Sequence, residues 1–184
     1  MTQSNRKSVT LVLGGARSGK SRFAQQLAAR AEKVTFFATA CASDDEMRRK
    51  IERHRRERPA SWTTVEVPVE LDHALRAHAA GSEILLVDCL TLYAANIMSH
   101  DRENNELMQQ RVDRLCETLR ALSTPVVLVS NEVGSGVVPP TAVGVLFRDL
   151  LGEINQKVAQ VADNVLVMFA GLPLALKGKI EVDA

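Results

Sequence analysis

Short, unbroken apolar runs alternate along this chain with longer stretches whose apolar residues recur every three to four positions. The runs are predicted strands, and they cover residues 9–13, 34–38, 84–87, 126–130 and 165–169. Continuous apolar runs are typical of parallel strands that are covered on both faces. Residues 63–67 are expected to form a further strand, short or at an edge because Pro68 follows them.

The stretches between these runs have the 3.6-residue period of amphipathic helices. One helix is predicted over 21–32, one over 70–80, one over 108–122 and one over 147–161. Polar residues 99–105 and the Gly/Pro-rich residues 133–140 are expected to be loops. Strands alternating with helices predict one doubly wound α/β domain over residues 1–184, with a mostly parallel sheet and helices on both faces.

The first predicted strand runs directly into a phosphate-binding loop of the form G-x-x-x-x-G-K-[ST], Gly14-Gly15-Ala16-Arg17-Ser18-Gly19-Lys20-Ser21. Glycines let the backbone wrap around an anion, so that N–H groups and the positive end of the next helix face the phosphates. Lys20 is expected to reach the β and γ phosphates, and the Ser21 hydroxyl to bind Mg²⁺. Strand, loop and helix together predict a P-loop NTPase-type fold that binds a nucleoside triphosphate. The competing interpretation is a glycine-rich turn that binds nothing.

Further candidate residues follow the other strands, because ligands collect at the carboxyl ends of such a sheet. Ala38 and Thr39 are small residues that would let a nucleotide approach. Asp88 has the form of a Walker B carboxylate, which would hold Mg²⁺ or its water or accept a hydroxyl proton. An aspartate at a strand end is also a common turn or cap residue. Residues 131–134 form another polar cluster at this edge.

A strongly charged segment over residues 43–59 predicts a short helix. Ser43 and Glu46 form a capping box, and Pro59 marks the end of the segment. Helical spacing places His54 on the face that carries the segment's only apolar residues, so His54 is predicted to face the domain.

Three interpretations of this segment stay open. Its charges are a solvated helix face, or a nucleic-acid patch, or a cluster delivered to nucleotide phosphates. In the third case the neutral imidazole of His54 attacks phosphorus while a neighbouring guanidinium such as Arg55 stabilises the anionic oxygens.

Composition narrows the possible partners and surroundings. The 184 residues carry a net charge of +1, which provides no overall field for nucleic acid or an anionic membrane. No apolar run approaches the roughly 20 residues that span a bilayer, and residues 1–7, expected to be disordered, lead into no signal-type core. A cytoplasmic location is therefore expected. Cys41, Cys89 and Cys116 are widely spaced and odd in number, as expected of reduced thiols.

Several longer motifs recur together in one family. They are Gly14 to Ser21, Asp44-Asp45-Glu46-Met47, His54-Arg55 with Arg58-Pro59, Trp62-x-Thr64-x-Glu66, Asp88-Cys89-Leu90-Thr91-Leu92, residues 131–139, Phe147-Arg148-Asp149, Asn155-Gln156 and Gly171-Leu172-Pro173. In this order they resemble the adenosylcobinamide kinase/adenosylcobinamide-phosphate guanylyltransferase family, over residues 9–177.

The resemblance implies a bifunctional enzyme of cobalamin assembly and salvage. Such enzymes phosphorylate adenosylcobinamide with a nucleoside triphosphate, ATP or GTP, and then transfer GMP from GTP to that phosphate through a covalent GMP-histidine. By the same resemblance His54 would carry the GMP, Thr39, Arg55 and Glu66 would contact nucleotide, and Asp88 would serve Mg²⁺. A small homo-oligomer is also implied, with no nucleic-acid partner.

The chain departs from the family after Pro139, where Pro140-Thr141-Ala142-Val143-Gly144 replaces a more polar stretch. This loses polar groups at the expected acceptor rim. Two other functions fit the phosphate loop and Asp88. One is a P-loop ATPase or nucleotide switch, and the other is a small-molecule kinase without guanylyl transfer.

Overall fold

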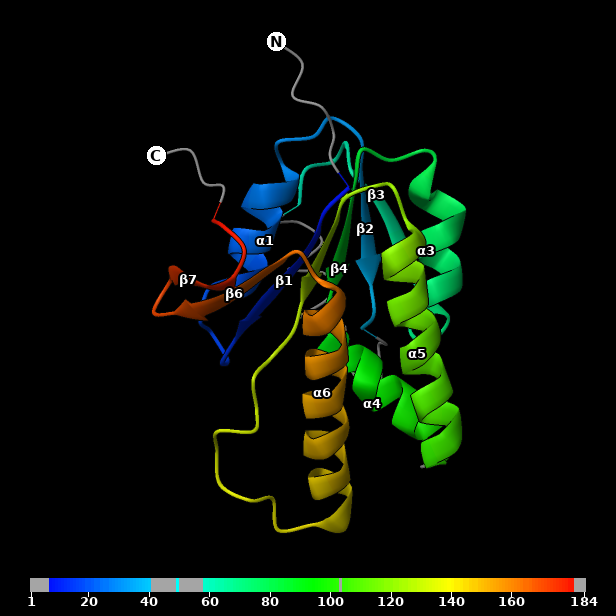
Figure 1. Ribbon diagram of the computed structural model, residues 1–184, viewed down its shortest axis with the longest axis vertical. Helices are drawn as coiled ribbons and strands as arrows, with labels where there is room; N and C mark the ends of the chain where they lie inside the picture. The colour runs from blue at the N-terminus through cyan, green and yellow to red at the C-terminus, as the bar shows by residue number, and fades with distance from the viewer. Residues whose placement is uncertain (1–6, 41–48, 50–57, 103, 181–184) are drawn as a thin grey trace.

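A seven-stranded sheet, in the order β3-β2-β4-β5-β1-β6-β7, forms the centre of the molecule (Figure 1). The computed structural model describes residues 7–40, 49, 58–102 and 104–180. The strands are β1 Val9–Gly14, β2 Val34–Ala38, β3 Thr63–Glu66, β4 Ile84–Asp88, β5 Val126–Val129, β6 Asn164–Phe169 and β7 Leu172–Lys177. All neighbouring strands are parallel except β6 and β7, which form an antiparallel hairpin. The predicted mostly parallel sheet is confirmed.

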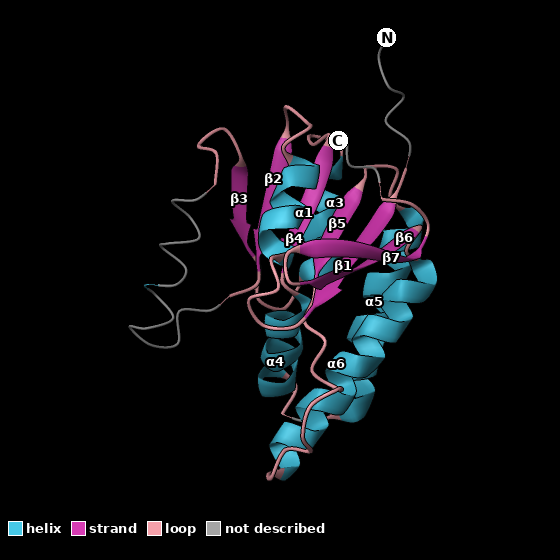
Figure 2. Cartoon of the chain, turned by 90° about the vertical axis from the view of Figure 1, so that its left-hand side faces the viewer, coloured by secondary structure: helices cyan, strands magenta, loops and turns pink. Residues whose placement is uncertain are grey.

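Helices cover both faces of this sheet (Figure 2). They are α1 Lys20–Ala28, α3 Leu71–Ala79, α4 Leu90–His100, α5 Asn105–Ala121 and α6 Ala142–Val161. Among the described helices, only α1 packs against one face, where Phe23 and Ala24 meet the strands. Helices α3 to α6 pack against the other face in a larger hydrophobic cluster. None of these described helices is both long enough and apolar enough to cross a membrane.

Side chains of the central strands belong alternately to the two hydrophobic clusters, because successive side chains of a strand point to opposite faces of the sheet. In β5, Val127 and Val129 lie in the cluster with α1, whereas Leu128 lies in the cluster with α5 and α6. In β4, Leu86 belongs to the first cluster and Val87 to the second. Burial on both faces explains why these strands lack a polar alternation.

Two elements were not predicted from the sequence. Residues 90–100 form a helix whose Leu90, Tyr93 and Ile97 are almost fully buried, so the expected polar loop begins only after His100. The second is β7, which was not predicted as a strand because its leucines are not separated by polar residues and Pro173 interrupts it. The first helix is also shorter than predicted and ends at Ala28.

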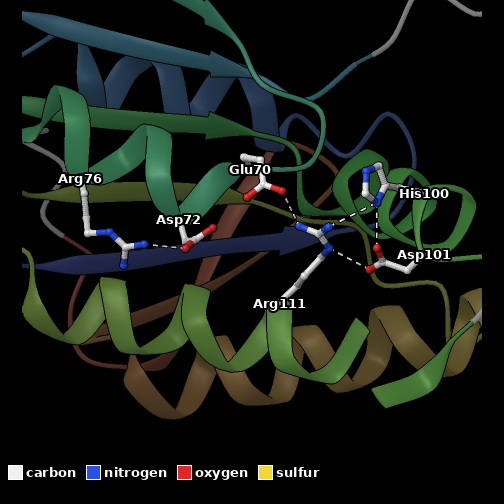
Figure 3. Close-up of polar contacts among 6 residues, drawn as sticks. All are labelled: Glu70, Asp72, Arg76, His100, Asp101 and Arg111. Carbon is white, nitrogen blue, oxygen red and sulfur yellow. Dashed lines mark hydrogen bonds and ion pairs between the residues drawn. The ribbon is translucent and has the colours of Figure 1, made fainter. Parts of the chain in front are cut away.

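A polar network ties the helices of the larger layer together (Figure 3). Arg111 of α5 donates from Nη1 to Glu70, just before α3, at 2.7 Å and from Nε to Asp101, just after α4, at 2.8 Å. His100 lies 2.8 Å from the same Asp101 carboxylate through Nδ1. Asp101 and Arg111 are 3% and 12% exposed, so the centre of the network is buried, whereas Glu70 and His100 lie at its exposed rim.

Candidate nucleotide-binding site

The register of the sheet brings the predicted strand-end residues to one edge. Val129 of β5 lies between Val12 of β1 and Asp88 of β4. Ala38 of β2 in turn lies between Asp88 and Glu66 of β3. The phosphate loop leaves the same edge two residues beyond Val12. This is the edge at which ligands bind in parallel α/β sheets.

Close packing shapes the phosphate loop. A side chain at Gly14, whose φ is +155°, would place its Cβ 2.5 Å from Ser18 Oγ and 2.9 Å from the Met168 carbonyl oxygen. Gly19 has a φ of +93° and begins α1 in the left-handed region. The N–H of Gly171, in the β6–β7 turn, donates to the Ser18 carbonyl at 3.0 Å. The β6–β7 hairpin therefore packs against the phosphate loop and holds its backbone in place.

Lys20 of the phosphate loop and Asp88 at the end of β4 are near enough to influence each other electrostatically. Burial lowers the pKa of Lys20, and the nearby charges of Cys89 and Asp88 oppose that shift. The Lys20 ammonium donates to the Gly15 carbonyl at 2.9 Å. An ammonium and a carboxylate beside a helix N-terminus can compensate a phosphate and its metal. Gly15, Ala16 and Arg17 are exposed at the rim, and Ser21 is half-buried in the first turn of α1.

Thr39 ties two strand ends together with its hydroxyl. Its Oγ1 accepts the Cys89 N–H at 2.8 Å and donates to the Cys89 carbonyl at 2.7 Å, and the whole residue is buried. The Thr39 carbonyl accepts the Asn96 amide at 2.7 Å. Thr39 therefore fixes the position of the Asp88–Cys89 backbone. Glu66 lies exposed on the edge strand.

The predicted histidine site is not among the described residues. His54 and Arg55, with most of the predicted helix over 43–59, fall outside them. The described chain resumes at Arg58, whose guanidinium stacks 3.7 Å from the centre of the Phe36 ring. The role of His54 stays a prediction.

Ser18 was predicted as part of the phosphate loop and Asn131 as part of the polar cluster at residues 131–134, and both have a side-chain oxygen that is buried and without a partner in the described part of the chain. The two oxygens are Asn131 Oδ1 and Ser18 Oγ. Both residues border Gly14, since Glu132 N–H donates to the Gly14 carbonyl at 3.2 Å. Buried polar atoms are normally paired, so unpaired ones at a ligand edge indicate a missing partner. The absence of a hydrogen-bond partner for these two oxygens can be seen only in the three-dimensional structure.

A hollow of about 310 Å³ lies elsewhere, between the end of α4 and α5. It is lined by His100, Asp101, Arg102, Leu107, Gln110, Arg111 and Arg114. Arg111 is already engaged by two carboxylates in the network of Figure 3. The phosphate loop contributes nothing to this hollow, so we do not assign the nucleotide to it.

Comparison with known proteins adds sequence relatives. A family model described as "Cobinamide kinase / cobinamide phosphate guanyltransferase" matches residues 10–176. The bifunctional adenosylcobalamin biosynthesis protein CobP of Pseudomonas aeruginosa is 44% identical over 170 residues, which cover 92% of this chain and 97% of the relative. The bifunctional adenosylcobalamin biosynthesis protein CobU of Escherichia coli K12 is 36% identical over 178 residues, which cover 91% of this chain and 98% of the relative.

Solved structures share the fold at low identity. An ATPase from the type III secretion system of pathogenic bacteria superposes with a TM-score of 0.61 at 12% identity, over 92% of this chain and 57% of that chain. The flagellar accessory protein FlaH of Methanocaldococcus jannaschii gives a TM-score of 0.54 at 14% identity, over 95% of this chain and 80% of that chain. These likenesses confirm the predicted P-loop NTPase-type fold.

Proposed function

This chain belongs to the cobinamide kinase / cobinamide phosphate guanyltransferase family, and we propose that its phosphate-loop edge serves both reactions. It is a bifunctional transferase of adenosylcobalamin biosynthesis. The observation that carries the assignment to this edge is the sheet register, which puts Asp88 of β4, Val129 of β5 and Val12, two residues before the phosphate loop, in one row. The substrates are adenosylcobinamide and the nucleotides ATP or GTP.

In the kinase reaction the loop holds the triphosphate while the acceptor hydroxyl reaches its γ-phosphorus. Backbone N–H groups from Gly14 to Ser21 and the start of α1 bind the anionic oxygens. Lys20 leaves the Gly15 carbonyl to compensate the charge on the phosphates. Thr39 acts by holding the Asp88 strand end, and Ala38 leaves room beside it.

Mg²⁺ fits the oxygen donors at this edge. The described residues contain no group of three or more His, Cys, Asp or Glu that would form an all-protein metal cage. Mg²⁺ bound to nucleotides takes few protein ligands and several waters and phosphate oxygens. The Ser21 hydroxyl and the Asp88 carboxylate would hold it, and the ion would neutralise charge on the phosphates.

In the guanylyl reaction we propose that His54 is the nucleophile. Its Nε2 or Nδ1 attacks the α-phosphorus of GTP, the bond to the β-phosphate oxygen breaks, and pyrophosphate leaves. Arg55 would stabilise the anionic oxygens. Glu66, exposed at the end of β3 beside Ala38 of β2, would contact the nucleotide. The phosphate of adenosylcobinamide phosphate then takes the GMP from the histidine.

Incubation with α-labelled GTP tests this proposal. Wild type should retain label in a linkage that is labile in acid and stable in base, as a phosphoramidate is. His54→Ala should lose the label and GMP transfer but still phosphorylate adenosylcobinamide. His73→Ala is a matched control, because His73 is an exposed residue of α3. His100 is a poorer control, since it contacts buried Asp101.

Each alternative predicts a distinct result in the same experiment. A nucleotide switch or ATPase gives no labelled protein and no phosphorylated acceptor. A kinase without guanylyl transfer gives phosphorylated acceptor and no labelled protein. Label on a peptide that lacks His54 would contradict the assignment of the nucleophile.

We also propose a small homo-oligomer. Phe169, Leu172, Leu174 and Leu176 of the hairpin are 55% to 72% exposed. No described strand pairs with the outer edge of β7. Large exposed apolar side chains on an edge strand favour association. Light scattering on wild type and Leu174→Lys tests this, and a monomeric wild type at micromolar concentration would contradict it.

A further inference from the structure

Asn131 lies directly beyond β5, the strand that separates the phosphate loop from Asp88. Val12, Val129 and Asp88 form one row across the sheet. Two residues further along each chain segment, the corresponding residues are Gly14, Asn131 and Leu90. The parallel ladder continues past β5, because Ser130 N–H donates to the Val12 carbonyl at 3.0 Å and Glu132 N–H to Gly14 at 3.2 Å. Asn131 therefore lies between the two elements that hold the triphosphate.

The backbone of Asn131 is held on both sides. Its N–H donates to Thr91 Oγ1 of α4 at 2.9 Å, and its carbonyl accepts the Asn155 amide of α6 at 2.9 Å. Asn155 is itself fixed, because its Oδ1 accepts the buried Ser130 hydroxyl at 2.6 Å. A residue whose backbone is anchored to two helices, and whose neighbours in sequence bond to β1, keeps its orientation when a ligand binds.

The side chain of Asn131 belongs to the α1 face of the sheet. Val127 and Val129 lie in the cluster with α1, and alternation puts the next odd residue on that face. Asp88 shares the face by the same alternation, two residues after Leu86. The carboxamide and the Asp88 carboxylate thus approach the phosphate loop from the same side.

The Asn131 carboxamide has an unsatisfied end. Its Oδ1 is inaccessible to water and has no hydrogen-bond partner among the described residues. By contrast, the Asn155 amide uses both its oxygen and its nitrogen, and so does that of Asn164, which donates to Thr10 and accepts from Lys179 N–H. A buried carboxamide oxygen without a hydrogen-bond donor destabilises the folded protein and is uncommon, and this one lies beside the proposed ligand site.

We propose, resting on the proposed kinase function, that Asn131 is a catalytic residue that contacts the transferred γ-phosphate. Its N–H₂ donates to a γ-phosphate oxygen, and its Oδ1 accepts from the Lys20 ammonium once Lys20 leaves the Gly15 carbonyl. The acceptor hydroxyl oxygen bonds to the γ-phosphorus and the bond from that phosphorus to the β,γ-bridging oxygen breaks. The bridging oxygen keeps the electron pair as nucleoside diphosphate, and the hydroxyl proton is released to water. Asn131 thus stabilises the negative charge on the γ-phosphate oxygens while the phosphoryl group is transferred.

The test compares α,β-methylene-GTP with α,β-methylene-GDP, which differ only in the γ-phosphate and resist guanylyl transfer. Calorimetry with Mg²⁺ gives the ratio of their affinities for each variant. Asn131→Ala should reduce the preference for the triphosphate about tenfold and leave diphosphate affinity unchanged. Asn131→Asp keeps the shape but replaces donors by a negative charge, so it should reduce the preference further. Phosphoryl transfer at saturating substrates should fall about 100-fold in Asn131→Ala.

Stability separates this role from a structural one. Because Asn131→Ala removes an unsatisfied buried oxygen, its melting temperature should equal or exceed that of wild type. Asn164→Ala removes a satisfied carboxamide at the opposite end of the sheet, so it should melt lower and keep the wild-type affinity ratio. Equal losses of both affinities in Asn131→Ala, or an unchanged ratio in Asn131→Asp, would overturn the proposal. Failure of wild type to bind either nucleotide would instead overturn the proposed function.

Discussion

The phosphate-loop edge and the Arg111 network are both built from polar residues, but they meet their hydrogen-bonding needs differently. In the network, Arg111 satisfies Asp101 inside the protein and Glu70 at its rim. At the phosphate-loop edge, two buried oxygens have no partner in the described chain and Lys20 rests on a backbone carbonyl. The contrast teaches that the network contributes to stability, whereas the edge is prepared for a ligand. Substitutions should therefore affect stability in one region and activity in the other.

Lys20→Ala should have the largest effect. Loss of the ammonium removes charge compensation in both reactions, and rates at saturating nucleotide should fall about 1,000-fold. Because burial lowers the pKa of Lys20, removing the charge should leave the free energy of unfolding within about 0.5 kcal/mol. Kinase and guanylyl assays with chemical denaturation measure both. Exposed Lys179→Ala is the control, and a Lys20→Ala enzyme with wild-type rates would contradict a shared site.

Arg111→Met should show the opposite pattern. It leaves the buried Asp101 carboxylate without its guanidinium, so unfolding should become easier by about 3 kcal/mol. Phosphoryl transfer per folded molecule should stay at the wild-type level, because Arg111 does not contact the phosphate loop. Urea denaturation and activity below the midpoint test this. A large fall in turnover without loss of stability would break the division between the regions.

Asp88→Asn should reduce metal-dependent turnover by about tenfold to hundredfold. The amide keeps the size of the side chain but binds Mg²⁺ less well than a carboxylate does. Nucleotide binding without Mg²⁺ should be unchanged. The two are measured by a magnesium titration of the rate and by calorimetry in EDTA. Equal losses in both measurements would indicate that Asp88 is only structural.

The stability supplied by Asp101 should disappear in acid. Burial alone would raise the pKa of Asp101, but hydrogen bonds from Arg111 and His100 lower it below the ordinary value. A carboxyl with a lowered folded pKa stabilises above its unfolded pKa, about 3.9, and loses that contribution as the pH falls through the folded pKa. Asp101→Asn should therefore cost about 2 kcal/mol at pH 7 and progressively less below about pH 4. Denaturation series at several pH values test this, and a constant difference would contradict it.

Glu70→Gln should have the smallest effect. Glu70 is 61% exposed, so its ion pair with Arg111 is screened by water. The loss in unfolding free energy should be about 0.5 kcal/mol or less, and it should vanish at high salt. Comparison at low and high salt checks this. A loss as large as that of Arg111→Met would show that the rim residue matters as much as the buried one.

Residues near each other in sequence made much of this site predictable. The phosphate loop combines strand, glycines and helix within one segment, so its position and its Lys20 followed from the motif alone. The fold class was also predictable, because each buried strand appears in the sequence as a continuous apolar run. Asp88 was predictable as a strand-end carboxylate, although only its position beside Lys20 distinguishes it from a turn residue.

Features that depend on distant partners were not predictable. Asn131 was predicted only as a member of the polar cluster at residues 131–134, and its unpaired oxygen depends on how α4 and α6 hold the backbone. The nucleotide contact of Thr39 stays a prediction, whereas the bond of its hydroxyl to Cys89, fifty residues away, was not predictable. The helix at residues 90–100 did have a helical apolar period. It was overlooked because it begins directly after a strand and ends in polar residues.

The position of β1 in the sheet has a consequence for synthesis of the chain. Its two neighbours are β5 and β6, so within the described chain residues 9–14 pair with residues 126–129 and 164–168 alone. A nascent chain that stops before β5 has the whole phosphate-loop motif but no strand to place it against. Pairings over such separations form slowly, because a long loop must close first. Nucleotide affinity should therefore arise only after β5 and β6 have been synthesised, and GTP should act as a ligand of the assembled sheet rather than of the segment that carries the phosphate loop.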